Sequence, residues 1–158
     1  MRLSIHDLRF TVYYDPMIEV VNRQRRFSVD TEKWRAFGEK ALREIGAESR
    51  GAIIAFVSDR MMRELNKEFR GRDATTDVLS FPAGRFEVAS VVEEDNLGDV
   101  VVSLQRAAAQ AVEHKLEFED EIAQLILHGL LHLCGHDHET DNGEMNRLEL
   151  KLRRRLSL

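Results

Sequence analysis

The chain has 158 residues, of which 43% are hydrophobic and 32% charged, with two prolines and one cysteine. These values fit one globular domain spanning residues 1–158 and argue against a fibrous, intrinsically disordered or disulfide-stabilised protein. The net charge of −5 argues weakly against a nucleic-acid partner, although the arginines gather in short groups, which leaves open either one basic face or an ordinary solvated surface.

The first half of the chain predicts strands that alternate with helices. The first ten residues contain no apolar run long enough for a signal peptide or a membrane span, so we expect a cytoplasmic protein without membrane contact. The expected elements are strands at 8–14, 51–58, 77–82, 86–92 and 99–103 and helices at 31–46 and 59–69. Thr31 or Asp30 is the expected N-cap of the first helix, and Gly46 its end.

The second half of the chain predicts helices. Residues 103–115 are alanine-rich and amphipathic, and 118–134 begin with acidic side chains and continue as an almost wholly apolar helix that should end at Gly135. Residues 143–156 form the last expected helix. The expected fold is therefore a single α+β domain, with a small mixed β-sheet packed against helices and the helix at 118–134 in the centre.

Four of the six histidines lie in the segment HGLLHLCGHDH at 128–138. His128 and His132 are four residues apart, so on a helix they differ by about 40° in direction and ~6 Å in height, and both imidazoles can reach one point. If the helix stops at Gly135, the chain can turn back and bring His138 to the same point. This is also the ligand spacing of the metzincin metalloproteases, and it predicts one zinc ion per chain.

Three imidazoles leave zinc an open coordination position, which is typical of a catalytic site with a bound water. Cys134 should face away from His132 on the helix and belong to the core. His136 could replace His138 as a ligand, lie in the second shell of the metal or be exposed, and we favour the last two. The two histidines outside the cluster are expected to be ordinary surface or hydrogen-bonded residues: His6 and His114.

The residue after the first histidine of the motif limits the chemistry. Zinc peptidases of this spacing have a glutamate there as general base, and here the position is Gly129. A peptidase would need another base, for which the candidates are Asp137, Asp141 and Glu144. A phosphodiester instead requires a cation and a hydrogen-bonding fork to stabilise charge on the phosphoryl oxygens. The motif therefore favours a nuclease over a peptidase.

Three segments resemble the signatures of the YbeY family of bacterial ribosomal RNA maturation endoribonucleases. They are HGLLHLCGHDH at 128–138, LNKEFRGRDATTDVLSFP at 65–82 and LGDVVVS at 97–103, in the family's order, with family-like residues continuing at Met145 and Glu149. The first sixty residues carry little of the resemblance. One departure is His136, where the family commonly has tyrosine.

The resemblance implies a zinc-dependent, single-strand-specific endoribonuclease that acts in small-subunit rRNA 3′-end maturation and ribosome quality control. Its implied ligands are His128, His132 and His138, and its implied partners are single-stranded ribosomal RNA, the small ribosomal subunit, a small-subunit protein and an assembly GTPase. Asp137 and His136 would lie in the second shell, where Asp137 could orient a ligand imidazole. The residues placed near the RNA in the cleft are Arg72, Thr76, Ser80 and Phe81.

The resemblance also makes Arg70 the essential arginine of the cleft, acting with the zinc-bound water. A guanidinium stays charged and binds two phosphate oxygens at once, which suits it to hold a scissile phosphate. The alternative is a surface arginine paired with Glu68 or Asp73. For the whole chain, the alternatives to a nuclease are a zinc metallopeptidase-like hydrolase and a non-enzymatic, zinc-containing ribosome assembly factor.

Overall fold

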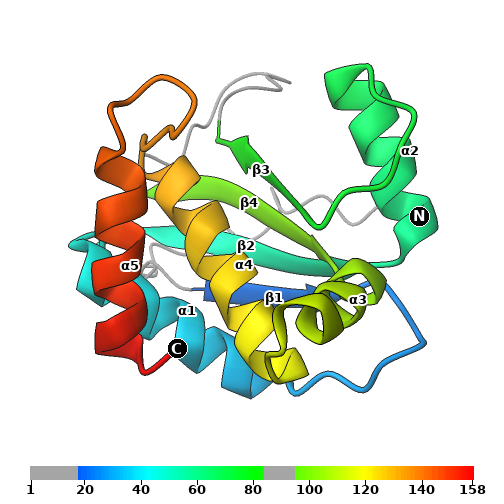
Figure 1. The fold of residues 1–158 in the computed structure, drawn as a ribbon, viewed down its shortest axis with the longest axis horizontal. Coiled ribbons are helices and arrows are strands. Elements are labelled where there is room, and N and C mark those ends of the chain that lie inside the picture. The colour runs from blue at the N-terminus through cyan, green and yellow to red at the C-terminus, as the bar shows by residue number, and fades with distance from the viewer. Residues whose placement is uncertain (1–17, 84–94) are drawn as a thin grey trace, which may run out of the picture.

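The computed structural model describes residues 18–83 and 95–158 (Figure 1). The elements in chain order are β1 (Ile18–Asn22), α1 (Thr31–Ile45), β2 (Gly51–Val57), α2 (Asp59–Arg70), β3 (Val78–Pro82), β4 (Asn96–Ser103), α3 (Leu104–His114), α4 (Phe118–Leu133) and α5 (Glu144–Leu156). The described part of the chain is thus a single α+β domain, as predicted.

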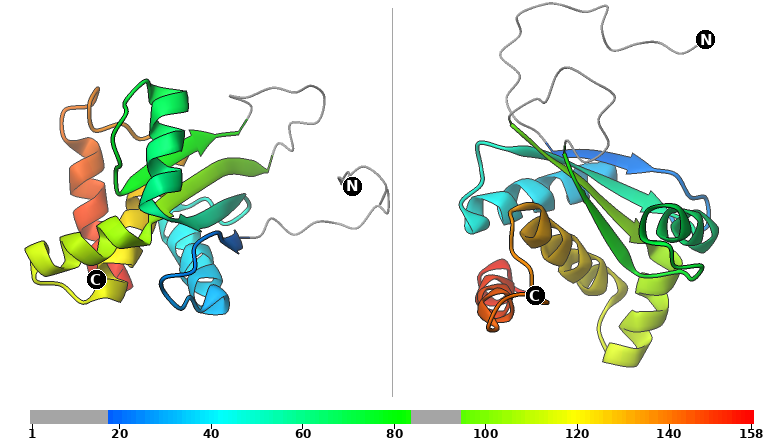
Figure 2. Two further views of the ribbon diagram at one scale, coloured as in Figure 1. Left: turned by 90° about the vertical axis from the view of Figure 1, so that its right-hand side faces the viewer. Right: turned by 90° about the horizontal axis from the view of Figure 1, so that it is seen from above.

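The four strands form one mixed sheet in the order β1-β2-β4-β3. β1, β2 and β4 run parallel, and β3 pairs antiparallel with β4 at one edge. Helices α1 and α4 cover one face of the sheet, α5 packs on the outside of these two helices, and α2 lies against the other face (Figures 1 and 2). Because neighbouring residues of a strand point to opposite faces, Ile54 and Phe56 of β2 enter the main core while Ala55 and Val57 pack toward α2.

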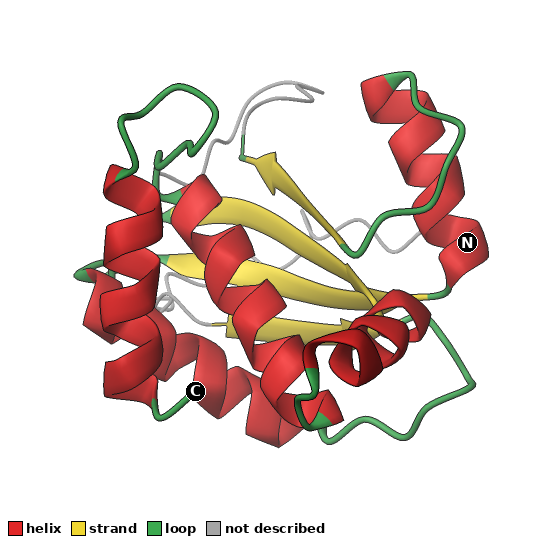
Figure 3. Cartoon of the chain, in the orientation of Figure 1, coloured by secondary structure: helices red, strands yellow, loops and turns green. Residues whose placement is uncertain are grey.

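α4 crosses the middle of the covered face and lies between the sheet and α5 (Figure 3). It contributes ten buried residues, among them Ile126, Leu127, Leu130 and Leu131, which have no accessible surface. The α2 helix buries only Met62 and Asn66. The main hydrophobic core therefore holds α4 rigidly against the sheet, and α2 is attached by a much smaller apolar cluster.

Most predicted elements are confirmed. The N-cap of α1 is Asp30, whose carboxylate accepts a hydrogen bond from Lys33 N, and Gly46 ends the helix with φ 89°. The helix expected at 59–69 extends to Arg70, and the strand expected at 99–103 begins at Asn96. β1 was not predicted, and the strands expected at 8–14 and 86–92 lie outside the described residues, as does His6.

No helix in the described ranges is both long and apolar enough to cross a bilayer.

Candidate metal centre

His128, His132 and His138 converge on one point, as the sequence predicts. Each offers a ring nitrogen, and the three ligand atoms lie within 4.8 Å of one another. The Nε2 atoms of His128 and His132 are 3.1 Å apart. Imidazole nitrogens at this separation, on one side of a helix, can bind a single metal ion with a position left for another ligand.

The end of α4 brings the third histidine to the other two. Gly135 adopts φ 92°, a left-handed conformation that glycine enters without steric cost. The amide of Gly135 donates to His132 O, and that of His136 donates to Leu131 O, which closes the helix with a tight turn. The chain reverses there, so His138 returns to the two histidines on the helix.

A buried glutamate of α5 holds His128. Glu149 is 6% exposed, and its Oε2 lies 3.0 Å from Nδ1 of His128. Because a carboxylate accepts hydrogen bonds, this contact keeps the imidazole proton on Nδ1 and leaves Nε2 free to bind a metal. Burial raises the pKa of Glu149, but hydrogen bonds from His128 and Arg153 outweigh it, and the net pKa is lowered. Glu149 therefore remains an anion next to the ligand set.

His132 lies in surroundings that favour a neutral ring. Its pKa is lowered, first by burial and then by the neighbouring charges of His128 and His138, against an opposing effect of Asp137. A metal binds the neutral form of imidazole, so a lowered pKa keeps this ligand available at neutral pH.

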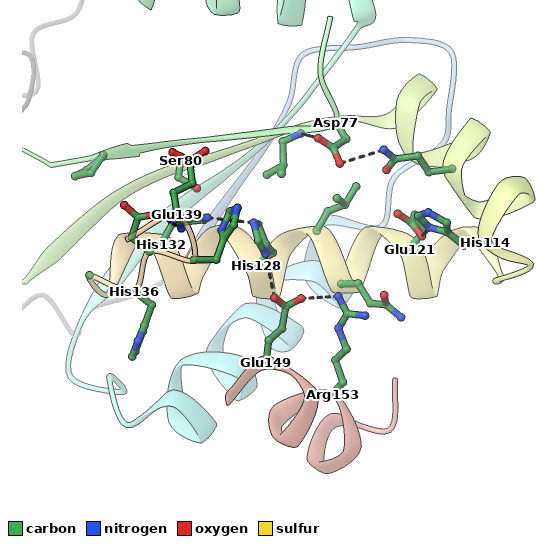
Figure 4. Close-up of a pocket in the computed structure, with 18 of the residues that line it drawn as sticks. Asp77, Ser80, His114, Glu121, His128, His132, His136, Glu139, Glu149 and Arg153 are labelled. Atoms are coloured by element: carbon green, nitrogen blue, oxygen red, sulfur yellow. Dashed lines mark hydrogen bonds and ion pairs between the residues drawn. The ribbon is translucent and has the colours of Figure 1, made fainter. Parts of the chain in front are cut away.

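The two other candidate ligands of the segment are not part of the cluster. The ring of His136 points away from those of His128 and His132 (Figure 4), although the residue lines the same cleft. Cys134 is half-buried against the main core, which agrees with its predicted core position, and burial raises the pKa of its thiol. The geometry of the described residues thus gives the three predicted histidines and neither of these two.

The acidic residues considered as alternative bases serve the loop that follows α4. Asp137 Oδ1 accepts a hydrogen bond from Glu139 N, and Glu144 Oε2 accepts one from Asn142 N. Asp141 accepts backbone hydrogen bonds at the start of α5, of which that from Met145 lowers its pKa most. The carboxylate hydrogen-bonded to a ligand imidazole is Glu149, whereas the proposed second-shell role of Asp137 stays a prediction.

Gly129 has no room for a side chain. A Cβ built there would lie 2.5 Å from Cγ1 of Val100 and 3.2 Å from Oγ of Ser80. The Ser80 hydroxyl donates to the carbonyl of Gly129 across the gap between β3 and α4. The glycine that replaces the peptidase glutamate is therefore required by the close approach of α4 to the sheet.

Arg70 and the three histidines line the same cleft. Within the described residues Arg70 forms no ion pair. The predicted alternative with Asp73 is not formed, because Asp73 pairs with Arg63 and Lys67. The guanidinium is thus available to an anion bound in the cleft.

β3 presents only part of the predicted RNA contacts to this cleft. Ser80 lines it, together with Val78 and Pro82 on the same face of the strand. Phe81 points to the opposite face, where its ring packs on that of Phe69 at a centroid distance of 5.4 Å. The other two predicted contacts, Arg72 and Thr76, do not line the cleft either: Thr76 donates to Asp77 Oδ1, and the amide of Arg72 donates to Asn66 O.

The structure adds a second histidine–glutamate pair that the sequence analysis missed. His114, expected to be an ordinary surface or hydrogen-bonded histidine, has its Nδ1 3.0 Å from Oε2 of Glu121 and also lines the cleft. Glu121 is 3% exposed, although its place in the first turn of α4 had indicated only a favourable interaction with the helix dipole. An acidic residue directly before an apolar helical run was the one available signal, and it is shared by many exposed helix starts.

The comparisons with known proteins agree with this geometry. The family model described as "Endoribonuclease YbeY" matches residues 19–157. A protein of that name from Clostridioides difficile is 44% identical over 108 residues, covering 66% of this chain and 71% of the relative. Another from Koribacter versatilis is 36% identical over 139 residues, covering 88% of this chain and 86% of the relative.

A solved structure has the same fold. The solution structure of TM1509 from Thermotoga maritima matches with a TM-score of 0.59 and 29% sequence identity, covering 89% of each chain. Residues 19–157, which the family model matches, include α4 and the loop that carries the third histidine.

Proposed function

The chain belongs to the YbeY endoribonuclease family, and from this premise we propose that it is a zinc-dependent, single-strand-specific endoribonuclease. Its proposed substrate is ribosomal RNA of the small subunit, whose 3′ end it would mature, with a further role in ribosome quality control in the cytoplasm. The proposed partners are the small ribosomal subunit, one of its proteins and an assembly GTPase. The observation that carries the proposal is the convergence of three histidines in a cleft that Arg70 also lines.

The residues present fit a zinc ion. Three neutral nitrogen donors with a carboxylate hydrogen-bonded to one of them form the donor set of many catalytic zinc sites. His128, His132 and His138 would hold the ion. When bound, zinc at such a site supplies a Lewis acid and lowers the pKa of a coordinated water toward ~7.

The protein's own groups divide the remaining work. Arg70 would bind two non-bridging oxygens of the scissile phosphate and neutralise the charge that develops on them. Glu149 fixes the tautomer and orientation of His128 through Nδ1. Ser80 donates to Gly129 O, which ties the strand at the cleft wall to the helix that carries two ligands.

The alternative of a zinc peptidase is disfavoured by Gly129. The glutamate that serves as general base in such enzymes cannot be accommodated where a Cβ would already meet Val100. The carboxylates of Asp141 and Glu144 are both engaged in backbone hydrogen bonds of the loop. Asp137, the third candidate, lines the cleft and accepts a hydrogen bond from Glu139 N through Oδ1.

The proposal is tested by metal analysis followed by cleavage of a single-stranded RNA and of a matched duplex. We expect one zinc per chain and cleavage of the single strand alone, abolished by a chelator and restored by zinc. The ends of the products distinguish attack by the 2′-hydroxyl, which leaves a 2′,3′-cyclic phosphate, from hydrolysis that leaves a 3′-hydroxyl. Cleavage of an unstructured peptide and not of RNA would overturn the proposal in favour of a peptidase.

A scaffold without catalysis is tested in the cell. Normal maturation of the small-subunit rRNA 3′ end with a folded His132→Ala protein as the sole copy would show that the protein acts in assembly without cutting RNA.

A further inference from the structure

The cleft continues along α4 well beyond the metal centre. The residues of α4 that line it are Glu121, Gln124, Leu125, His128 and His132. Their spacing of three or four residues places them on one stripe of the helix. From Glu121 to His132 this stripe rises by about 16 Å, at 1.5 Å per residue. A cleft of this length is larger than one metal ion and one phosphate require.

The end of the stripe that lies away from the metal centre carries His114 and Glu121 (Figure 4). The Glu121 side chain is 4% exposed and the His114 side chain 53% exposed. The buried carboxylate therefore accepts the Nδ1 proton and fixes the ring, while the rest of the imidazole is open to the cleft. The backbone hydrogen bond from Leu116 N to Ala111 O already closes the turn between α3 and α4. The His114–Glu121 pair is therefore not needed to hold this turn.

The surroundings of His114 favour its charged form. Its pKa is raised, first by the hydrogen bond to Glu121 and then by the negative charge of Glu121, with a further contribution from Glu113, while burial and the charge of Arg153 act in the opposite direction. The groups that face it are thus Glu121 of α4, Glu113 of α3 and Arg153 of α5. His114 therefore keeps its positive charge to a higher pH than a free histidine does.

We propose that His114, held by Glu121, is a second RNA contact, which binds a backbone phosphate about two or three nucleotides from the phosphate cleaved at the metal centre. The spacing follows from the helix: Glu121 precedes His128 by seven residues, a rise of about 10 Å. A stacked strand with the B-form rise of about 3.4 Å per nucleotide along its axis covers that distance in about three nucleotides. Gln124 and Gln110, whose Nε2 donates to Asp77 Oδ2, also line the cleft. The inference rests on the proposed nuclease function. It goes beyond that function by proposing how long a stretch of single-stranded RNA the cleft contacts.

The test uses the zinc-loaded full chain and a ladder of single-stranded RNAs, extended one nucleotide at a time on either side of the cleaved bond. For the wild type at pH 6.5, kcat/KM should rise by about tenfold at the second or third added nucleotide on one side. His114→Gln, whose amide can still donate to Glu121, should lose this rise while cutting the shortest RNA at the wild-type rate. An equal rise in His114→Gln, or no rise in the wild type, would overturn the inference.

A neighbouring residue provides the matched control. Lys115 is exposed, adjacent in sequence and absent from the described lining of the cleft, so Lys115→Gln removes one positive charge and should keep the full rise. Loss of the rise in both variants would indicate a general charge effect and overturn the specific contact. A pair that only joins α3 to α4 would change the unfolding midpoint of His114→Gln and leave the length dependence of cleavage unchanged.

Two binding measurements separate failure of this contact from failure of the nuclease proposal. They use the anisotropy of a fluorescein-labelled 12-nucleotide RNA with zinc-loaded Arg70→Ala protein, whose cleavage is expected to be slow. Adding His114→Gln should reduce the slope of log K against log salt by about 0.7, the value for one phosphate contact on a single strand. Glu121→Gln should shift the pH at which RNA affinity falls to a lower value. Unchanged salt and pH dependence would overturn the contact even if the wild type cuts no RNA.

Discussion

Two histidines of the cleft each have Nδ1 hydrogen-bonded to a buried glutamate, but their neighbours differ. His128, held by Glu149, has a second imidazole 3.1 Å from its Nε2, whereas His114, held by Glu121, has no other histidine of the described residues beside it. At the first pair three rings gather where they can hold a metal ion. At the second the pKa of the histidine is raised, which favours its charged form. A histidine hydrogen-bonded to a buried glutamate can therefore bind either a metal ion or an anion. Which of the two it binds depends on the groups that surround its Nε2 atom.

The largest expected effect is the loss of zinc and of RNA cleavage when one histidine of the His128 cluster is removed. His132→Ala is expected to lose stoichiometric zinc and with it RNA cleavage, because two remaining imidazoles do not form a catalytic zinc site. Metal analysis of the dialysed protein measures the first effect. His136→Ala, at a histidine that points away from the cluster, should keep its zinc. If His136→Ala lost as much zinc as His138→Ala, the ligand assignment would be wrong.

Variants of Arg70 test whether RNA cleavage takes place at the end of the cleft that carries the three histidines. Arg70→Ala should retain zinc and fold but lose roughly two to three orders of magnitude in RNA cleavage, as when one preorganised charge-stabilising donor is removed. Arg70→Lys should recover little, because an ammonium restores the charge without the two-pronged geometry. Single-turnover cleavage by zinc-loaded protein measures both. Near-normal cleavage by Arg70→Ala would contradict the assigned role.

Replacement of each buried glutamate by glutamine should affect zinc binding differently at the two histidine–glutamate pairs. Glu149→Gln is expected to weaken zinc binding about 10- to 100-fold, the range for a residue that orients a metal-ligating histidine. Glu121→Gln changes the same chemical group seven residues before His128 and should leave the zinc affinity unchanged. Competition with a chromogenic chelator gives both affinities, and equal losses would show that the effect is one of folding.

The smallest expected effect is on stability, and its sign should differ between the two regions in the metal-free protein. The pKa of His114 is raised above 6.5, so its contribution is fully present below pH 6.5 and is lost as pH rises through the folded-state pKa. The pKa of His132 is lowered below 6.5, so the unfolded state takes up a proton first, and stability is lost as pH falls below 6.5.

Urea midpoints measured between pH 5 and 8.5 test these signs. The gap between wild type and His114→Gln should shrink as pH rises, and the gap between wild type and His132→Gln should shrink as pH falls. Solvent screening keeps the first effect small, because the His114 side chain is half exposed. Parallel curves for the two variants would contradict the opposite protonation of the two sites.

Features with a local cause could be predicted from the sequence. Asp30 and Gly46 bound α1 through capping and a left-handed residue, and the ligand histidines follow from a four-residue spacing and a helix stop at Gly135. The pairing partners could not be predicted in this way. Glu149, which lies on α5, is 21 residues from His128 in the sequence. Whether Glu121 is buried depends on how α3 packs on α4.

Two further differences have the same origin. The five-residue edge strand β1 has too short a pattern to stand out before the sheet is known. The face on which Phe81 lies depends on the register of β3 against β4, where it pairs with Asp99. Sequence spacing within α4 and the helix stop after it therefore located the histidine cluster, while contacts across elements decided the rest of the cleft.

The limited burial of α2 has a consequence for motion. A helix that buries only Met62 and Asn66 should open locally at a lower free energy than α4, which contributes ten buried residues. The amide protons of α2 should therefore exchange with solvent deuterium before those of α4. Arg70 is the last residue of α2, so the exchange rate of its amide proton would report how often the end of α2 opens locally. Bound RNA should slow this exchange.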